Sequence, residues 1–316
     1  MGPAIYALSL IGVGIIVGRI KFLERVTKPA FRSLNLAILW GMLPIIVFVS
    51  IARYSRDQIL SFGSAAILAF VSMGASFALA VVFSTLMHHD RKTTIAVTLN
   101  AAFMNVTYLG LPIVYAIMAG MGGPRPASAY LGPASLFAVV IAVPNLALGV
   151  VLASGAAKRR LSAGSVLENV LIFPATIALI AAMLFIGFDA HLPDVVSETF
   201  DHFLAKPFFA LMLLFVGFQM PIVDPRKYKS KLATVGTIRF LVSPLVTYGL
   251  MMALGLTIGD IVSRPSLIMA IMPPAVFNIF LAHNFNLDRK LYGAIVFYLT
   301  IISLFIVLPL MIFLVF

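Results

Sequence analysis

Ten apolar segments, each long enough to cross a membrane as a helix, limit the folds open to this chain. A hydrocarbon core of about 30 Å requires about 20 helical residues at about 1.5 Å per residue. The segments cover approximately residues 3–20, 34–52, 62–87, 93–119, 127–154, 165–187, 200–222, 233–257, 264–283 and 291–316. Apolar residues make up 62% of the sequence and charged residues 10%, which excludes a soluble domain of this length. The sequence therefore predicts an all-α polytopic membrane protein that lies in a lipid bilayer.

Lysine and arginine residues gather in alternate loops, and this bias predicts the orientation of the chain. Sixteen of the 22 lie in or beside the loops after odd-numbered segments, and five in or beside those after even-numbered segments. Loops rich in these residues stay in the cytoplasm. We therefore expect both termini on the non-cytoplasmic side of a cell membrane, either a plasma membrane or an inner membrane. Because the net charge of +11 is divided among short loops, no nucleic-acid partner is expected.

Two segments contain proline where a membrane helix would otherwise be continuous. They hold Asn105-Val-Thr-Tyr-Leu-Gly-Leu-Pro112 and Met272-Pro-Pro-Ala-Val-Phe-Asn278. Proline removes a backbone donor and crowds the carbonyl four residues earlier, so it kinks or breaks a helix. Two interrupted segments at corresponding positions of two halves are typical of a transporter's binding site. We expect breaks at Gly110 and Pro112 and at Pro273 and Pro274, with simple kinks as the alternative.

Proline spacing also predicts that the chain consists of two copies of one unit. Three pairs of prolines are separated by 161–165 residues, namely Pro44 and Pro207, Pro112 and Pro273, and Pro144 and Pro309. A unit of five helices is odd-numbered, so its second copy enters the membrane upside down, as in many secondary transporters. The predicted copies are residues 1–157 and residues 158–316.

Several motifs, in the same order along nearly the whole chain, resemble those of the auxin efflux carrier family. Asn105 with Tyr108-Leu-Gly-Leu-Pro112 resembles the family's fourth helix. The others are Leu34-Asn-Leu36 with Leu43-Pro44 for the second helix, Leu211–Gly217 for the seventh, and Met272–Asn278, Asn286-Leu-Asp288 and Ser303–Pro309 for the ninth and tenth. The chain lacks the long cytoplasmic loop of many plant members, and so resembles a compact prokaryotic one.

This resemblance implies a fold similar to bile-acid symporters and sodium–proton antiporters, in which helices 4 and 9 are broken and cross. Helices 1, 2, 6 and 7 would form a scaffold and the contact of a homodimer. Helices 3–5 and 8–10 would form a transport domain that moves past the scaffold as an elevator. The implied function is secondary transport of small organic anions, auxin-like acids or mono- and dicarboxylates, with export as the expected direction.

The predicted site is uncharged and suits an anion. Helix N-termini carry about half a positive charge, and two of them would meet at the crossing. The expected substrate contacts are Asn105, Thr107, Tyr108, Asn145 and Asn278. No Asp or Glu lies in the central part of any apolar segment, which departs from the acidic residue that some family members carry in helix 3. Coupling to protons or sodium therefore stays open.

Alternatives to these assignments remain. Asn105 and Asn278 also fit contacts between helices, which is the reading we favour for Asn100 and for the close packing of Gly14 and Gly18. Arg239 is expected to reach the cytoplasmic boundary, or else to attract an anion.

Three other functions compete with the anion carrier. They are a sodium-coupled organic-anion symporter of the bile-acid type, a non-transporting receptor on the same scaffold, and an intramembrane enzyme. The chain has no Gly-x-Ser-x-Gly, no His-Glu-x-x-His and no paired membrane aspartates, so no enzyme and no catalytic residue is predicted. It also has no cysteine and no metal-ligand spacing of histidines, so no metal or cofactor is expected.

Cysteine labelling tests the predicted topology, because the chain contains no cysteine of its own. Arg159→Cys lies in a predicted cytoplasmic loop, and Ala190→Cys lies in a predicted outer loop. An impermeant thiol reagent added to intact cells is expected to label position 190 and to spare position 159. Labelling at position 159 with protection at position 190 would mean that the orientation is reversed.

Overall fold

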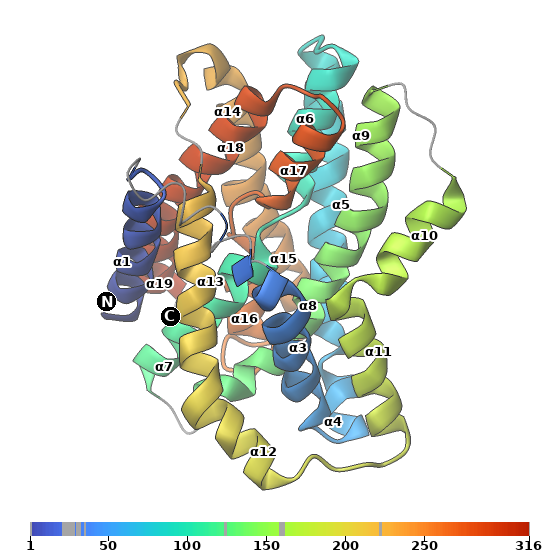
Figure 1. The fold of residues 1–316 in the computed structure, drawn as a ribbon, viewed down its shortest axis with the longest axis vertical. Coiled ribbons are helices and arrows are strands. Elements are labelled where there is room, and N and C mark those ends of the chain that lie inside the picture. Colours follow the sequence, from blue (N-terminus) through green and yellow to red (C-terminus); the bar gives the residue numbers. More distant parts are fainter. Residues whose placement is uncertain are drawn as a thin grey trace.

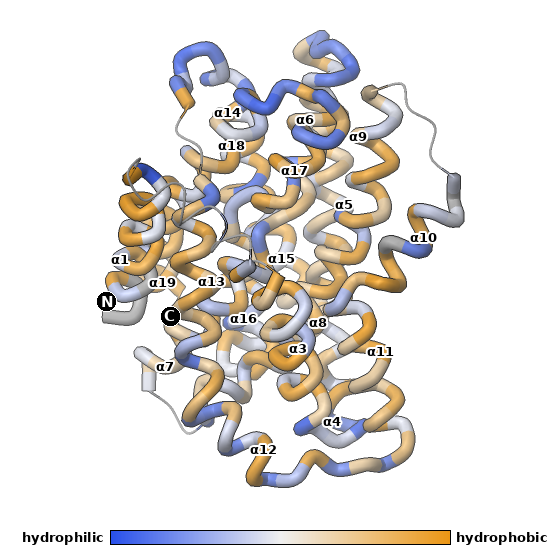
Figure 2. Tube along the Cα trace, in the orientation of Figure 1, coloured by the Kyte–Doolittle hydropathy of each residue, from blue (hydrophilic) through white to orange (hydrophobic). Residues whose placement is uncertain are grey.

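The computed structural model describes residues 2–20, 29, 33–34, 36–122, 125–157, 162–220 and 223–315. Its helices form a bundle, and most of the connecting loops lie at two opposite ends of it (Figure 1). Figure 2 shows a mainly apolar belt between these ends. Large apolar side chains such as Phe70, Leu245 and Phe313 are 62%, 67% and 84% exposed, as expected for a surface that faces lipid. Of the predicted loop and motif residues, those that lie outside the described residues are Lys21, Arg25, Lys28, Arg32, Asn35 and Lys158–Arg160.

The first half of the chain begins with α1 (Gly2–Val17) and ends with α9. Between them lie η2 (Ile38–Met42), α3 (Leu43–Ala52), α4 (Arg56–Ser61), α5 (Gly63–Leu86), α6 (Arg91–Ala102), η3 (Val106–Gly110), α7 (Leu111–Met121), η4 (Ala127–Tyr130), α8 (Leu131–Pro144), η5 (Asn145–Gly149) and α9 (Val150–Ala156). The long α5 packs against α6, α8 and α15 and so holds the two halves together.

The second half of the chain is also built of helices. It contains α10 (Ala163–Ile172), α11 (Pro174–Gly187), α12 (Asp194–Thr199), η6 (Phe200–Leu204), α13 (Ala205–Gln219), η7 (Arg226–Tyr228), α14 (Lys229–Thr237), η8 (Ile238–Val242), α15 (Ser243–Ala253), α16 (Ser263–Ala270), α17 (Phe277–Asn284), α18 (Arg289–Ile302), η9 (Ser303–Val307) and α19 (Leu308–Val315).

The lengths of these helices confirm an all-α polytopic membrane protein. Five helical stretches are long and apolar enough to cross a membrane, and the bent pair Gly164–Ile172 and Pro174–Gly187 makes a sixth candidate. The five are Arg56–Leu86, Ala127–Ala156, Asp194–Gln219, Arg226–Ala253 and Arg289–Val315. The apolar helices Leu8–Val17, Ile38–Ala52 and Val106–Met121 are shorter. The count of ten spans therefore stays a prediction.

Several proline residues lie within continuous helical stretches, each just after a π-helical turn. Six π-helical turns lie among the described residues, and five of them end two or three residues before a proline. In such a turn the N–H before the proline bonds to a carbonyl five residues back, as Leu111 does with Val106. The wider turn relieves the crowding of the proline ring against the carbonyl four residues earlier. The prolines concerned are Pro44, Pro112, Pro207, Pro244 and Pro309.

Glycine brings α1 and α13 into backbone contact. A Cβ atom on Gly14 would lie 2.1 Å from the carbonyl oxygen of Leu214, and one on Gly217 would lie 2.1 Å from that of Ile11. The close packing predicted for Gly14 and Gly18 is therefore confirmed, and its partner is the helix that carries Gly217. A second pair of helices, α3 and α11, also packs closely.

We expect Gly14→Ala to lower the midpoint of thermal unfolding in detergent. The added methyl group has no room against the α13 backbone, and overpacking of this kind costs about 1–3 kcal/mol. Gly12→Ala in the same helix is the matched control, because no atom lies within 4 Å of a Cβ there. Its expected effect is a gain of about 0.5–1 kcal/mol from helix propensity. Equal melting of the two variants would contradict the backbone contact.

Candidate functional site

Two helices of the bundle are interrupted, and their extended residues pair with each other. The helix α6 ends at Ala102 before η3 begins at Val106, and α16 ends at Ala270 before α17 begins at Phe277. Met104 and Pro274 form an antiparallel bridge. The N–H of Asn105 donates to the carbonyl of Pro273 at 2.7 Å, and the N–H of Ala275 donates to that of Phe103 at 2.9 Å. We call residues 103–105 and 273–275 the paired break.

The position of the first interruption corrects the prediction. Pro112 does not mark it, because Pro112 lies near the start of α7 and the preceding π turn accommodates its ring. The chain is extended at Phe103–Asn105 instead, opposite Pro273 and Pro274, where proline disfavours the helical conformation of the residue before it. Gly110 lies beside this region, and a Cβ there would be 2.4 Å from the sulfur of Met269. Gly110 therefore permits a close approach of the two interrupted segments.

The C-terminal ends of α6 and α16 meet a buried arginine. Arg239, in η8, is 0% exposed. Its Nη1 donates to the carbonyl of Ala102 and its Nη2 to that of Ala270, each at 3.3 Å, and Nη2 also contacts the hydroxyl of Ser243. The expectation that Arg239 reaches the membrane boundary is therefore wrong. Two helix ends with partial negative charge hold the guanidinium inside the protein instead.

Serine hydroxyls donate hydrogen bonds to backbone carbonyls at the end of α16. The Oγ of Ser243 donates to the carbonyl of Ala270 at 2.9 Å and lies 2.8 Å from the Oγ of Ser72. The Oγ of Ser303 donates to the carbonyl of Ile271 at 2.9 Å. Unpaired backbone groups at membrane depth are costly, so these hydroxyls help to make the interruption possible.

Asn278 joins the two interrupted segments and does not reach the cavity described next. Its Nδ2 donates to the carbonyl of Leu99 at 3.1 Å and to Oδ1 of Asn100 at 3.3 Å, and its side chain is fully buried. Asn100 donates in turn to the carbonyl of Ala96 at 2.8 Å. Asn100 thus has the packing role expected of it. Asn278 has a similar role here, which differs from the substrate contact predicted for it.

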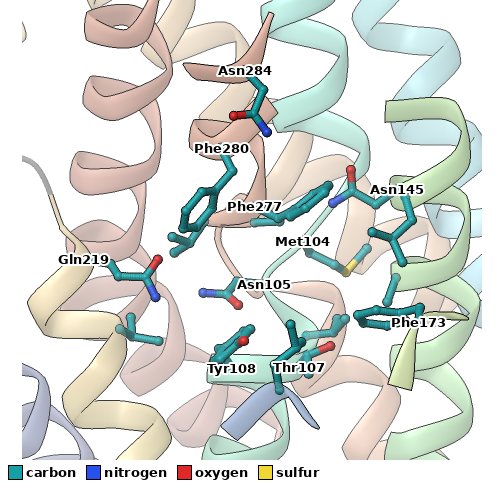
Figure 3. Close-up of a pocket in the computed structure, with 17 residues that line it drawn as sticks. Met104, Asn105, Thr107, Tyr108, Asn145, Phe173, Gln219, Phe277, Phe280 and Asn284 are labelled. Carbon is teal, nitrogen blue, oxygen red and sulfur yellow. The ribbon is translucent and has the colours of Figure 1, made fainter. Parts of the chain in front are cut away.

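A cavity of about 330 Å³ lies beside the paired break (Figure 3). Four of the five predicted substrate contacts line it: Asn105, Thr107, Tyr108 and Asn145. Asn278, Gly110, Pro112, Pro273 and Pro274 do not. The cavity is also lined by residues outside the predicted set, among them Phe173, Gln219, Phe277, Phe280 and Asn284.

Three of the missed residues share one face of a helix. Phe277, Phe280 and Asn284 have the spacing of one side of α17, which is the side toward the cavity (Figure 3). This spacing after the predicted interruption was a usable signal. Gln219 reaches the cavity from the end of α13, and its position depends on how α13 packs, so no local pattern could have indicated it.

Two carboxamides at the cavity have atoms without a partner. Asn105 and Asn145 are only 4% and 5% exposed. The Nδ2 of Asn105 and the Oδ1 of Asn145 have no hydrogen-bond partner among the described residues. A buried polar atom without a partner costs about 1–3 kcal/mol. An unused donor and an unused acceptor therefore lie on two residues that line the cavity.

Comparison with known families decides the class of this protein. A family model described as membrane transport protein matches residues 6–312. The chain belongs to this family. It is the auxin efflux carrier family that the motifs indicated, so that prediction is confirmed. A search of curated proteins finds no match. The protein is thus a multi-pass membrane transporter.

The cavity of the transporter lies beside partial positive charges that no acidic side chain of the described residues balances. It is lined at the N-terminal starts of η3 and α17, where partial positive charge collects. The opposing C-terminal ends are occupied by Arg239. No acidic or basic side chain lines the cavity among the described residues, and none of their acidic and histidine groups is arranged to hold a metal ion. The cavity therefore faces partial positive charge from two helix starts and no ionised side chain of the described residues.

A network of side chains lies away from the cavity, at the end of the transporter that carries α4 and α12 (Figure 1). The guanidinium of Arg53 makes two hydrogen bonds of 3.1 Å to the carboxylate of Asp201. The hydroxyl of Ser128 donates to the same carboxylate at 2.7 Å, and the hydroxyl of Tyr54 donates to the carbonyl of Ala129. The start of the fifth predicted segment is thereby tied to the second and seventh.

We expect Asn278→Ala to destabilise the transporter by about 1–3 kcal/mol, because it removes two buried hydrogen bonds. The measurement is the midpoint of thermal unfolding of the purified protein. Asn105→Ala is the matched control, because the amide nitrogen that it removes has no partner. If Asn278→Ala melted like the unmodified protein but lost ligand binding, its role would lie with the substrate and not with the fold.

Proposed function

We propose that the transporter carries small organic anions and that the cavity beside the paired break is its substrate site. The observation behind this proposal is the meeting of two helix N-termini at a cavity lined by carboxamides and by no described acidic side chain. A bound carboxylate would accept hydrogen bonds from Nδ2 of Asn105 and from backbone N–H groups at the start of η3. The carboxamide of Asn145 would make a further hydrogen bond to a polar group of the substrate.

The apolar part of the cavity favours an acid with a flat ring. Phe173, Phe277 and Phe280 line it together with the ring of Tyr108, which packs against Phe215 with 5.7 Å between ring centroids. Aromatic side chains bind planar rings by stacked or edge-on contacts. A second carboxylate would find no described basic side chain in the cavity. We therefore propose an auxin-like aromatic monocarboxylate in preference to a dicarboxylate, with export as the direction.

The proposed architecture has ten spans in two inverted repeats, residues 1–157 and 158–316, whose interrupted helices cross at the paired break. The packing of α1 with α13 and of α3 with α11 supports it, since these are spans 1 with 7 and 2 with 6. In the two proposed repeats span 1 corresponds to span 6 and span 2 to span 7, so the pair 1 with 7 is equivalent to the pair 6 with 2. These four spans would form the scaffold, with exposed apolar faces on α3 and α11 for a homodimer contact.

An elevator motion is the proposed transport step. The cavity takes Gln219 and Phe173 from the proposed scaffold, and takes Asn105, Asn145 and Phe277 from the proposed transport domain. The cavity would therefore change shape when one group slides past the other. Under the predicted topology, Gln219 and Asn284 lie toward the cytoplasm and the Arg53–Asp201 network lies outside. The bond from Ser128 to Asp201 would hold the outer side shut in this state.

A binding measurement on purified protein tests the site. A thermal-shift screen over indole acids and dicarboxylic acids supplies the ligand. We expect Asn105→Ala to weaken its binding by roughly 10- to 100-fold, since a hydrogen bond to a charged group contributes about 1.5–3 kcal/mol. Asn100→Ala is the control, because this buried carboxamide lies outside the cavity.

Two results would contradict the proposed function. Unchanged affinity in both Asn105→Ala and Asn145→Ala would exclude this cavity as the substrate site. Stronger binding of an amine with the same ring system would exclude the preference for anions.

A further inference from the structure

The substrate site leaves one charged group without a function. Arg239 is fully buried, and no carboxylate among the described residues forms an ion pair with it. A charge buried in this way is very costly unless neighbouring groups stabilise it. Arg239 is therefore stabilised by the groups that accept its hydrogen bonds. The chemistry of these groups indicates which kinds of ion they can bind.

The acceptors around Arg239 form a set of oxygen atoms suited to a cation. They are the last carbonyls of two helices, at Ala102 and Ala270, and the hydroxyl of Ser243, with that of Ser72 hydrogen-bonded to it. Carbonyls at the C-terminal ends of interrupted helices are typical ligands of coupling cations in secondary transporters. In this chain a guanidinium contacts both of these carbonyls.

We propose that Arg239 is a permanent cation of the paired break, which removes any need for a coupling sodium ion there. The statement about sodium coupling rests on the proposed carrier function, whereas the cation-binding role of Arg239 does not. Truncation of Arg239 would leave an oxygen-lined site with partial negative charge from two helix ends. That site would accept a small monovalent cation, with guanidinium the best match in shape.

Thermal unfolding of the detergent-purified protein tests this inference at constant ionic strength. Choline chloride is exchanged for sodium chloride, or guanidinium chloride is added at about 10 mM, well below its denaturing range. The midpoint of the unmodified protein is expected to be the same in choline and in sodium. Arg239→Ala is expected to melt at a lower temperature in choline and to recover, with saturation, when guanidinium or sodium is present.

Two further variants complete the experiment. Ser303→Ala removes a hydrogen bond to Ile271 in the same region without removing a cation. It should melt earlier, and guanidinium should not restore it. Arg239→Lys keeps the charge, so it is expected to fold and to be indifferent to sodium. If Arg239→Ala does not fold, the unmodified protein and Arg239→Lys still decide the question.

Several outcomes would overturn the inference. One is saturable stabilisation of the unmodified protein or of Arg239→Lys by sodium. Another is an Arg239→Ala variant that melts like the unmodified protein in choline, or that melts early and responds to neither cation. None of these measurements includes a substrate. A failure here is therefore distinct from a failure of the proposed anion site.

Discussion

A helix interrupted at membrane depth releases backbone groups that water cannot reach, and the rest of this structure depends on how they are satisfied. The N–H groups of Asn105 and Ala275 each donate to a carbonyl of the other interrupted segment. The carbonyls at the helix ends receive Arg239, Ser243 and Ser303. Neither interruption could exist alone, because each supplies part of the other's hydrogen bonds.

The hydrogen bonds between the two interrupted segments leave the partial charges of their helix ends in different surroundings. The negative ends of α6 and α16 are neutralised by a fixed guanidinium, whereas the positive starts of η3 and α17 remain at the cavity wall. Under the proposed function, an anion at the cavity and the guanidinium of Arg239 would stabilise the same pair of interrupted helices from opposite ends. Under the proposed function only the anion is exchanged, so each transport cycle would move the charge of the substrate and no coupling charge through this region.

Sequence patterns predicted the family, the apolar segments and four cavity residues, because these follow from local composition and motif. They failed where the outcome depends on packing. Pro112 indicated an interruption, but a π turn accommodates its ring. Asn278 stands next to Phe277, and the rotation of α17 turns one toward α6 and the other toward the cavity. Arg239 was assigned to the boundary because no sequence pattern shows that two helix ends will converge on it.

The distribution of hydrogen bonds also indicates which helices can move together. Ser72, Arg239 and Ser303 come from α5, η8 and η9, and all three bond within the region of the paired break. These elements are thus linked to α6 and α16 by buried polar contacts that are costly to break. Gln219 and Phe173 approach the same cavity from α13 and from the start of α11. A sliding motion that separates these two groups would preserve every hydrogen bond of the paired break while it opens the cavity, which is the property that an elevator mechanism requires.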